Sequence, residues 1–479
     1  MNTKFKIKKN FTEGPIFFRI LFFAVPIMLT GLLQLCYNMA DNMVVGRFSG
    51  DPLALAAVGC TSSFNNLIIN LLLGVAAGTG VVVAQLYGAD EHRLLDRTIH
   101  TMLVFSFFAG IAFSGIGILI SKPILTAMGT KPEVLSRAVL YMRIICLGIP
   151  ASAVYNFGAS VCRAVGNSKV PLAILGTSGL VNVILNIVFV VFCGMTVDGV
   201  AFATITSQYL SAAAVIYYLS CQKNESYAIS LKRLCFDKRL LSRVLRYGIP
   251  SGIQSSMFSI SNMLITSAIN TFPTTTVSAN TIASNIDSIA YTTMNSFSQA
   301  AMTFTGQNWG AGKTDRMRRV YWYTFIWVSI FGIGVGQLAR LFVVPLSSLY
   351  IDGANPDAAE ITAVVSEITT IILTTYFLCG IMDIQSGFLR GMGYSFTPMI
   401  TSLVSICVVR IIWIYCVFFP IEKMNTRFGL YVSYPVSWGL AAIAFGILSV
   451  GAFRKLRRFD EARKKKAEQN SALAGAVAQ

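Results

Sequence analysis

An aspartate stands inside the first long apolar run of the sequence. Asp41 follows Tyr37 by four residues and Gln34 by seven, so these side chains and Asn38 share one face of a helix. A charge at the middle of a membrane costs about 2.5–3.5 kcal/mol on insertion scales, so such a face is expected to point into a bundle or towards water. The alternative is that Asp41 caps the helix end before Gly46.

Neutral oxygen donors occur in later apolar runs. Asn182 and Asn186 lie four residues apart and therefore on one helix face, and Asn156 and Thr204 lie in the runs before and after them. One carboxylate with amide and hydroxyl oxygens suits a small monovalent cation, whose hydration they replace, or a proton. We therefore expect Asp41, Asn156, Asn182, Asn186 and Thr204 to bind H⁺ or Na⁺, with no other metal. A purely structural polar cluster is the alternative for the Asn and Thr residues.

The second half of the chain carries its own intramembrane charges. Asp287 and Asp383 are candidates for a second coupling site, and Arg410 is a plausible counter-ion for either acid, which leaves a structural ion pair equally open. A cavity surface for bulky ligands is expected from polar and adaptable apolar side chains. The proposed lining residues are Gln34, Tyr37, Asn38, Met257 and Met294, for which a core role is the alternative.

The elements that must position these residues are membrane helices. The chain of 479 residues is 54% hydrophobic and only 12% charged, with mean hydropathy +0.65, whereas a soluble domain is about a quarter charged. A helix needs about 20 apolar residues to span a bilayer, and twelve runs meet this requirement. They are 16–46, 53–87, 96–121, 134–163, 168–193, 197–220, 242–272, 276–309, 317–350, 358–391, 395–420 and 428–453. We therefore predict an all-α polytopic membrane protein.

Basic residues fix the expected orientation. The net charge of +17 is spread over short loops and the two ends, which does not form a nucleic-acid-binding face. Most Lys and Arg residues fall on one side of the twelve spans, so the positive-inside rule places both termini in the cytoplasm. The expected cytoplasmic segments are the N-terminal tail 1–15, a basic linker 222–241 and the C-terminal tail 454–479. The last is expected to be a surface-associated or frayed helix, with a solvated topology anchor as the alternative.

The two halves of the chain repeat one another. FFAVPIMLTG around Pro26 matches RYGIPSGIQS around Pro250, AQLYGADEHR matches GQNWGAGKTD, and CRAVGNSKVP matches LRGMGYSFTP, at offsets of 224, 222 and 227 residues. Each copy holds six spans, so both enter the membrane in the same orientation. Parallel repeats of this kind are typical of secondary transporters. We expect two pseudo-symmetric lobes, 16–221 and 242–453, that enclose a cavity and rock against each other.

Signatures of other protein classes are missing from the sequence. There is no GxxxxGK[ST] or HExxH motif, only two histidines occur, and none of the ten cysteines forms a CxxC pair. We therefore expect no enzymatic activity and no cofactor apart from the coupling ion.

Several motifs together resemble the multidrug and toxic compound extrusion (MATE) transporters. GRFSGDPLALAAVG after Asp41, the pair QLYGAD and QNWGAG, and the pair RAVGNSKVP and RGMGYSFTP carry the resemblance, which extends over about residues 15 to 453. It implies a V-shaped fold of two six-helix lobes. It also implies export of amphipathic, often cationic, organic compounds in exchange for H⁺ or Na⁺.

The resemblance also implies roles for single residues. In similar members, an N-lobe site uses an acid on the first helix, an Asn on the fourth, an Asn-x-x-x-Asp pair on the fifth and a Thr on the sixth. These positions correspond to Asp41, Asn156, Asn182, Asn186 and Thr204, where Asn186 replaces an acid and removes one negative charge.

We therefore expect an inner-membrane antiporter that acts as a monomer on small organic molecules. The alternatives are a lipid-linked oligosaccharide flippase and a non-transporting membrane scaffold or receptor.

Overall fold

The fold consists of helices joined by short loops. The computed structural model describes residues 11–48, 50–51, 53–348, 350–351 and 356–477, and no strand occurs among them. Residues 1–10 and 478–479, which belong to the two predicted tails, lie outside the described residues.

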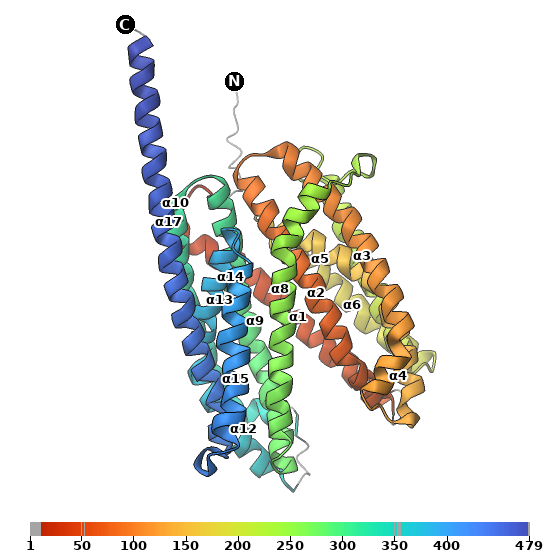
Figure 1. Cartoon of the computed structure of the whole chain (residues 1–479). Coiled ribbons are helices and arrows are strands. Elements are labelled where there is room, and N and C mark those ends of the chain that lie inside the picture. The colour runs from red at the N-terminus through yellow and green to blue at the C-terminus, as the bar shows by residue number, and fades with distance from the viewer. Residues whose placement is uncertain (1–10, 49, 52, 349, 352–355, 478–479) are drawn as a thin grey trace.

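Six spans form the first half of the chain (Figure 1). They are α1 (Phe17–Phe48), α2 (Ala54–Gly88), α3 (His92–Ala127), α4 (Pro132–Leu147) with α5 (Ile149–Ala164), α6 (Lys169–Ile187) with the π-helical turn η1 (Val188–Phe192), and α7 (Val197–Cys221). A linker with the short turn η2 (Leu231–Arg233) leads to the second half.

The second half repeats this order. Its spans are α8 (Lys238–Ile269), α9 (Thr274–Gly310), α10 (Thr314–Leu341) with α11 (Val343–Ser348), α12 (Ala358–Thr374) with α13 (Tyr376–Gly391), the run α14 (Phe396–Ser402), η3 (Leu403–Val408), α15 (Val409–Ile412) and η4 (Trp413–Phe418), and α16 (Arg427–Tyr431) with α17 (Ser433–Val477). The turn η5 (Glu422–Met424) precedes α16.

Most of these helices are apolar enough to cross a membrane. Within the described residues, eight single helices meet this requirement by length and composition, and two bent pairs, α4 with α5 and α12 with α13, bring the number to ten. The other two, α8 and α9, are long but rich in Ser, Thr and Asn. The predicted fold of twelve membrane helices in two six-helix lobes is confirmed.

The internal repeat is visible in the geometry. The fourth span of each half is broken, by 44° between Leu147 and Ile149 and by 42° between Thr374 and Tyr376. Pro26 lies inside α1 and Pro250 inside α8, which are the first helices of the two halves. The sequence repeat therefore corresponds to a repeat of backbone shape.

The first helix of each half crosses to the other lobe. Ile20, Phe23 and Ile27 of α1 belong to the hydrophobic core formed by the second half, whereas Val44 and Val45 belong to a core of the first half. Conversely, α8 packs extensively against α2, and its residue Val244 lies in a core of the first half. The predicted lobe boundaries are not tested by these contacts and stay a prediction.

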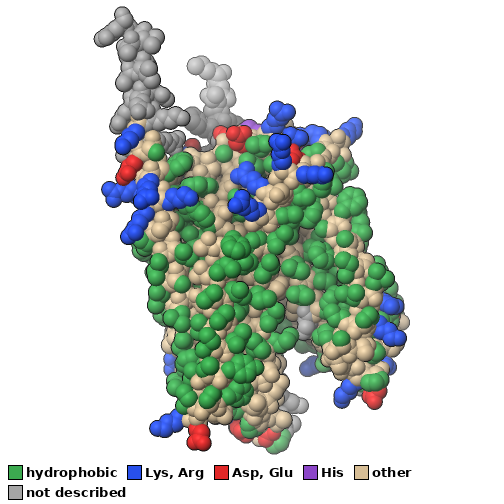
Figure 2. All heavy atoms as spheres, in the orientation of Figure 1, with side chains coloured by type: hydrophobic (Ala, Val, Ile, Leu, Met, Phe, Trp, Pro, Cys, Tyr) green, Lys and Arg blue, Asp and Glu red, His purple; other side chains and the backbone are tan. Residues whose placement is uncertain are grey.

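The two ends of the molecule differ in charge and in closure. Lys and Arg side chains gather at the end where both termini lie, and a cleft between the lobes opens at the other end (Figure 2). We call the first end the basic end; it includes Arg97, Arg233 and Arg316. The linker is held there, because His100 Nε2 accepts from Ser230 N at 3.0 Å and Arg233 pairs with Asp96 of α3.

The C-terminal tail does not begin as a separate segment at residue 454. Helix α17 continues unbroken to Val477 and stands away from the body of the molecule (Figure 1). Leu456 is buried, Phe459 packs against Trp309, and Asp460 accepts from Thr314 Oγ1 at 2.5 Å. The tail is helical, as expected, and Phe459 and Asp460 hold its first turns against the second half, while its cytoplasmic location stays a prediction.

Candidate functional site

Helix α1 places Asp41 against α6. Asn186 Nδ2 donates to Asp41 Oδ1 at 2.5 Å. One turn earlier, the Tyr37 hydroxyl donates to the Gly176 carbonyl oxygen at 3.0 Å. The Tyr37 ring fills the notch at Gly179, where a Cβ atom would lie only 1.9 Å from the ring. The face of α1 that carries Tyr37 and Asp41 therefore binds α6 and does not face lipid.

The cluster continues through α6 to α7. Asn186 Nδ2 also donates to Asn182 Oδ1 at 3.3 Å, and Asn182 Nδ2 lies 3.5 Å from Thr204 Oγ1. Thr204 also has a hydrogen-bonding interaction with Asp41. We call Asp41, Asn182, Asn186 and Thr204 the Asp41 cluster. Three helices meet in it, and the fully buried Asn186 keeps an amide oxygen without a hydrogen-bond partner.

The structure does not bring Asn156 into this cluster. Its amide donates to the Ser152 carbonyl oxygen at 2.9 Å, one turn earlier in α5. The amide nitrogen of Asn156 is therefore bound within α5, and its part in the ion site stays a prediction. A side chain that sequence reasoning missed is the buried Tyr141 of α4, which lies close enough to interact electrostatically with Asp41.

The residues expected to line a cavity fall into three groups. Gln34 and Asn38 are exposed, whereas Tyr37 is half-buried against α6. Met257 is half-buried, and its carbonyl oxygen accepts from the Cys407 thiol at 3.4 Å.

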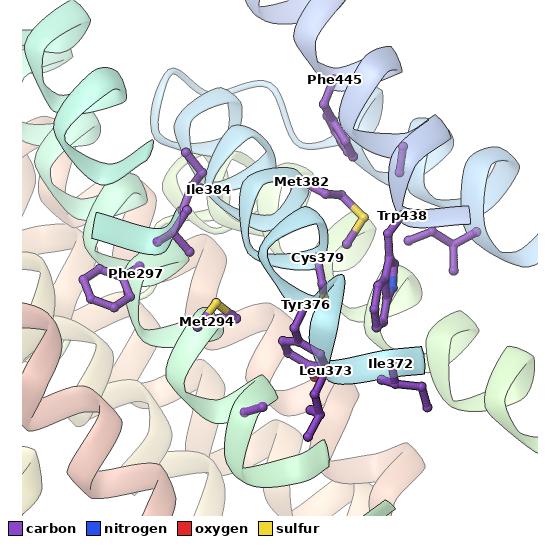
Figure 3. Close-up of a cluster of buried hydrophobic side chains, with 14 of the residues drawn as sticks. Met294, Phe297, Ile372, Leu373, Tyr376, Cys379, Met382, Ile384, Trp438 and Phe445 are labelled. Atoms are coloured by element: carbon purple, nitrogen blue, oxygen red, sulfur yellow. The ribbon is translucent and has the colours of Figure 1, made fainter. Parts of the chain in front are cut away.

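Met294 is a core residue and does not line a cavity. It is 0% exposed and lies among the side chains of the second-half core (Figure 3). Its sulfur fills the space beside Gly380 of α13, where a Cβ atom would lie 2.7 Å away. The expectation of a substrate contact at Met294 is wrong because the face of α9 that carries it packs against α13.

Arg410 does not pair directly with either acid of the second half. It donates to Ser437 Oγ at 3.1 Å and to Asn262 Oδ1 at 3.0 Å, and its guanidinium lies 4.1 Å from the centre of the Tyr434 ring. Asp287 and Asp383 have no ion pair with it among the described residues, which corrects that expectation. Each acid keeps one buried carboxylate oxygen without a partner.

Two glutamines join the lobes at the basic end. Gln85 of α2 donates to the Gly391 carbonyl oxygen in the second half at 3.0 Å, and Gln307 of α9 donates to the Ala164 carbonyl oxygen in the first half at 2.7 Å. Sequence reasoning aligned these residues but assigned them no function. The internal repeat could have identified this contact, because two glutamines at matching repeat positions indicate a contact around the pseudo-symmetry axis.

Glycines allow this contact to be close. A Cβ atom at Gly88 would lie 2.0 Å from the Gln307 carbonyl oxygen, and one at Gly310 would lie 1.9 Å from that of Gln85. Gly74 and Gly78 likewise approach the backbone of Gly252 and Gly248, where α2 crosses α8. We call the region around Gln85, Gly88, Gln307 and Gly310 the basic gate.

Two duplicated helical lobes, a cleft open at one end, and a half-buried acid among neutral oxygens define a two-lobed membrane transporter. The family model MatE matches residues 26–188 and 250–416, one match in each half. The chain belongs to this family, the MATE multidrug efflux transporters.

Relatives and solved structures agree with this assignment. The chain is 26% identical over 441 residues to the probable multidrug resistance protein YoeA of Bacillus subtilis, covering 88% of this chain and 90% of that protein. A crystal structure of MATE in complex with MaL6 superposes with a TM-score of 0.88 at 20% identity, covering 95% of this chain and 100% of the other. A multidrug resistance MATE transporter in an outward-facing conformation gives 0.86 at 22% identity, with the same coverage.

Proposed function

We propose that this protein is an antiporter that exports amphipathic, cationic organic compounds in exchange for H⁺ or Na⁺ through the cavity between the lobes. The basic end faces the cytoplasm, because positive charge is retained there. The chain then lies in the inner membrane with both termini inside, and the cleft opposite the basic end opens outward.

The Asp41 cluster is the observation that carries this proposal. A carboxylate, two amides and a hydroxyl converge from three helices, and the buried Asn186 oxygen has no partner. Oxygen donors with one negative charge suit Na⁺, and the carboxylate alone suits a proton. The residues therefore fit either ion, and the second-half acids Asp287 and Asp383 are a secondary candidate site.

Ion uptake changes what holds α1 in place. With Asp41 ionised, the Asn186 donor binds a charge; with Asp41 protonated or cation-bound, that hydrogen bond weakens. Helix α1 then moves relative to α6, and Pro26 provides the break at which it bends. The substrate-binding surface of the cavity then closes, and the bound organic compound is released to the outside. Each net elementary charge moved through 100 mV supplies about 2.3 kcal/mol, so a one-for-one exchange with a monovalent cation draws on the concentration gradient of the ion alone.

Transport from sealed proteoliposomes tests the proposal. Efflux of a cationic dye is measured with a Na⁺ gradient and a proton gradient imposed separately, and an anionic dye tests the charge preference. We expect one gradient to drive efflux in the wild type and neither to do so in Asp41→Asn. Asp198→Asn is the control, because Asp198 binds Thr196 at the start of α7, outside the cluster.

Ion-driven efflux by Asp41→Asn at the wild-type rate would remove Asp41 from the mechanism. Wild-type protein that responds to neither gradient would instead favour the flippase or the scaffold.

A further inference from the structure

The residues just before α1 fold onto the basic end of the second lobe. Phe11 is 8% exposed and Thr12 is 4% exposed, although both precede the first membrane helix. The Phe11 ring stacks on Phe304 of α9, with ring centres 3.8 Å apart and planes 9° apart. Its edge packs against Phe23 of α1 at 5.1 Å. A solvated tail would not bury an aromatic ring between two helices.

The backbone of this segment is bound as firmly as its ring. Phe11 N donates to Gln307 Oε1 at 2.7 Å, and the Phe11 carbonyl oxygen accepts from Arg316 at 3.1 Å and from Asn308 at 3.3 Å. Lys313 Nζ donates to the Thr12 carbonyl oxygen at 3.0 Å. We call residues 11–14 the N-terminal latch. Side chains of the second half satisfy both backbone groups of Phe11.

Gln307 connects the latch to the gate between the lobes. Its amide oxygen accepts from Phe11 N, while its amide nitrogen donates to Ala164 of the first lobe at 2.7 Å. The side chain is fully buried, so both bonds form away from water. Withdrawal of the latch would leave the amide oxygen of Gln307 without this partner and free the side chain to leave Ala164.

The other glutamine of the basic gate is held in a related way. The Gln85 amide oxygen accepts from Arg243 Nη2 at 3.2 Å, and Arg243 lies near the start of α8. In each half, a donor at or just before the start of the first helix therefore binds the gate glutamine of the other half. Phe11 N binds Gln307, and Arg243 binds Gln85. The two donors differ, because Arg243 is a half-exposed charge and Phe11 is a buried backbone group.

We propose that the N-terminal latch positions Gln307 so that the basic gate stays closed, and that the latch must leave α9 before the basic end can open. This inference rests on the proposed rocking of the lobes and adds the element that controls one of its two end states. The latch runs directly into α1, which also carries Asp41. Movement of α1 on ion binding is thus transmitted to the gate through the same helix.

Hydrogen exchange of the full chain in lipid nanodiscs tests the latch. We expect Phe11→Ala to raise amide exchange by about tenfold in residues 160–168 and 304–312, on the two sides of the gate. Phe17→Ala is the control, because the Phe17 ring packs on Tyr323 and Trp327, whereas Phe11 supplies the bond to Gln307. It is expected to leave exchange at 160–168 unchanged.

Two further variants keep the test decisive if Phe11→Ala folds poorly. Phe11→Leu retains apolar bulk and the backbone bonds, so exchange close to the wild type is expected. Gln307→Leu removes both the bond to Phe11 and the bond to Ala164. It should therefore raise amide exchange at the same residues as Phe11→Ala. Faster exchange confined to residues 11–20, or no change at 160–168 in both Phe11→Ala and Gln307→Leu, would overturn the proposal.

Transport by the same variants separates this inference from the proposed function. If the wild type responds to no ion gradient but Phe11→Ala still raises exchange at the basic gate, the antiport proposal is refuted and the latch proposal is supported. If an ion gradient drives efflux by the wild type and Phe11→Ala changes neither amide exchange at the gate nor transport, the latch proposal is refuted and the antiport proposal is supported.

Discussion

Replacing Gly310 by alanine tests how tightly the basic gate closes. The added Cβ atom would lie 1.9 Å from the Gln85 carbonyl oxygen and 3.0 Å from Ala89 N. Carbon atoms of this kind essentially never approach a heavy atom closer than 3.0 Å, so at least 3.0 − 1.9 = 1.1 Å of separation is needed. The obstructing atom belongs to the backbone of α2. A side-chain rotation therefore cannot relieve the clash, and the lobes must separate.

The size of the effect follows from this overlap. Overpacking of a well-packed contact costs about 1–3 kcal/mol, and the cost falls only on the state in which the gate is closed. A free-energy difference of that size changes an equilibrium by about 5- to 150-fold. We therefore expect Gly310→Ala to shift the population towards the state open at the basic end by one to two orders of magnitude, and Gly88→Ala to act in the same direction.

The assay is hydrogen exchange in nanodiscs, read at residues 84–90 and 304–312, with the thermal unfolding midpoint measured in parallel. Gly439→Ala is the matched control, because nothing lies within 4 Å of a Cβ atom built there. It should leave gate exchange unchanged and stabilise α17 slightly. Wild-type exchange at the gate in both Gly310→Ala and Gly88→Ala would refute the reasoning that these glycines close the basic end.

Three further predictions concern the membrane interior. Asn186→Leu should lower the proton concentration for half-maximal efflux by at least about tenfold, because the lost hydrogen bond to the ionised Asp41, of a kind that contributes roughly 1.5–3 kcal/mol, no longer opposes protonation, whereas Asn156→Leu should leave it unchanged. Gly179→Ala should reduce efflux, since its Cβ atom would lie 1.9 Å from the Tyr37 ring, and a second change, Tyr37→Ala, should restore part of it. Met294→Ala should destabilise the fold by about 2–5 kcal/mol, measured by denaturation, without altering the range of dyes transported. An altered range of dyes would show that Met294 contacts the substrate.

Helical periodicity explains which parts of the site were predictable. Spacing of four residues places Asn182 and Asn186 on one face of α6, and Tyr37 and Asp41 on one face of α1, and the structure joins these two faces. Periodicity says nothing about which face of one helix meets which face of another. Asn156 was assigned from its place in an apolar run and from the resemblance, neither of which fixes its hydrogen-bond partner, and its amide nitrogen binds its own helix.

Composition predicted the membrane helices but could not separate core from cavity. Helices α8 and α9 carry polar residues over much of their length, so hydropathy gives no clear apolar face. Met294 was therefore assigned to a substrate surface with a core role as the alternative, and its packing against Gly380 decides for the core. Similarly, Arg410 was paired with the two acids of the second half from the sequence, but a side-chain amide and a hydroxyl bind the guanidinium instead.

The crossing of α1 between the lobes has a consequence for coupling. Its outer part is tied to the first lobe through Asp41 and Asn186, and its basic part is packed in the core of the second lobe near Phe23. A rigid-body rotation of one lobe against the other cannot preserve both sets of contacts unless the helix bends between them. Pro26 removes one backbone hydrogen bond of α1 in that interval. Ion binding at Asp41 and binding of the latch at Phe11 therefore act on the same helix. A movement of α1 that breaks one of these two contacts strains or releases the other.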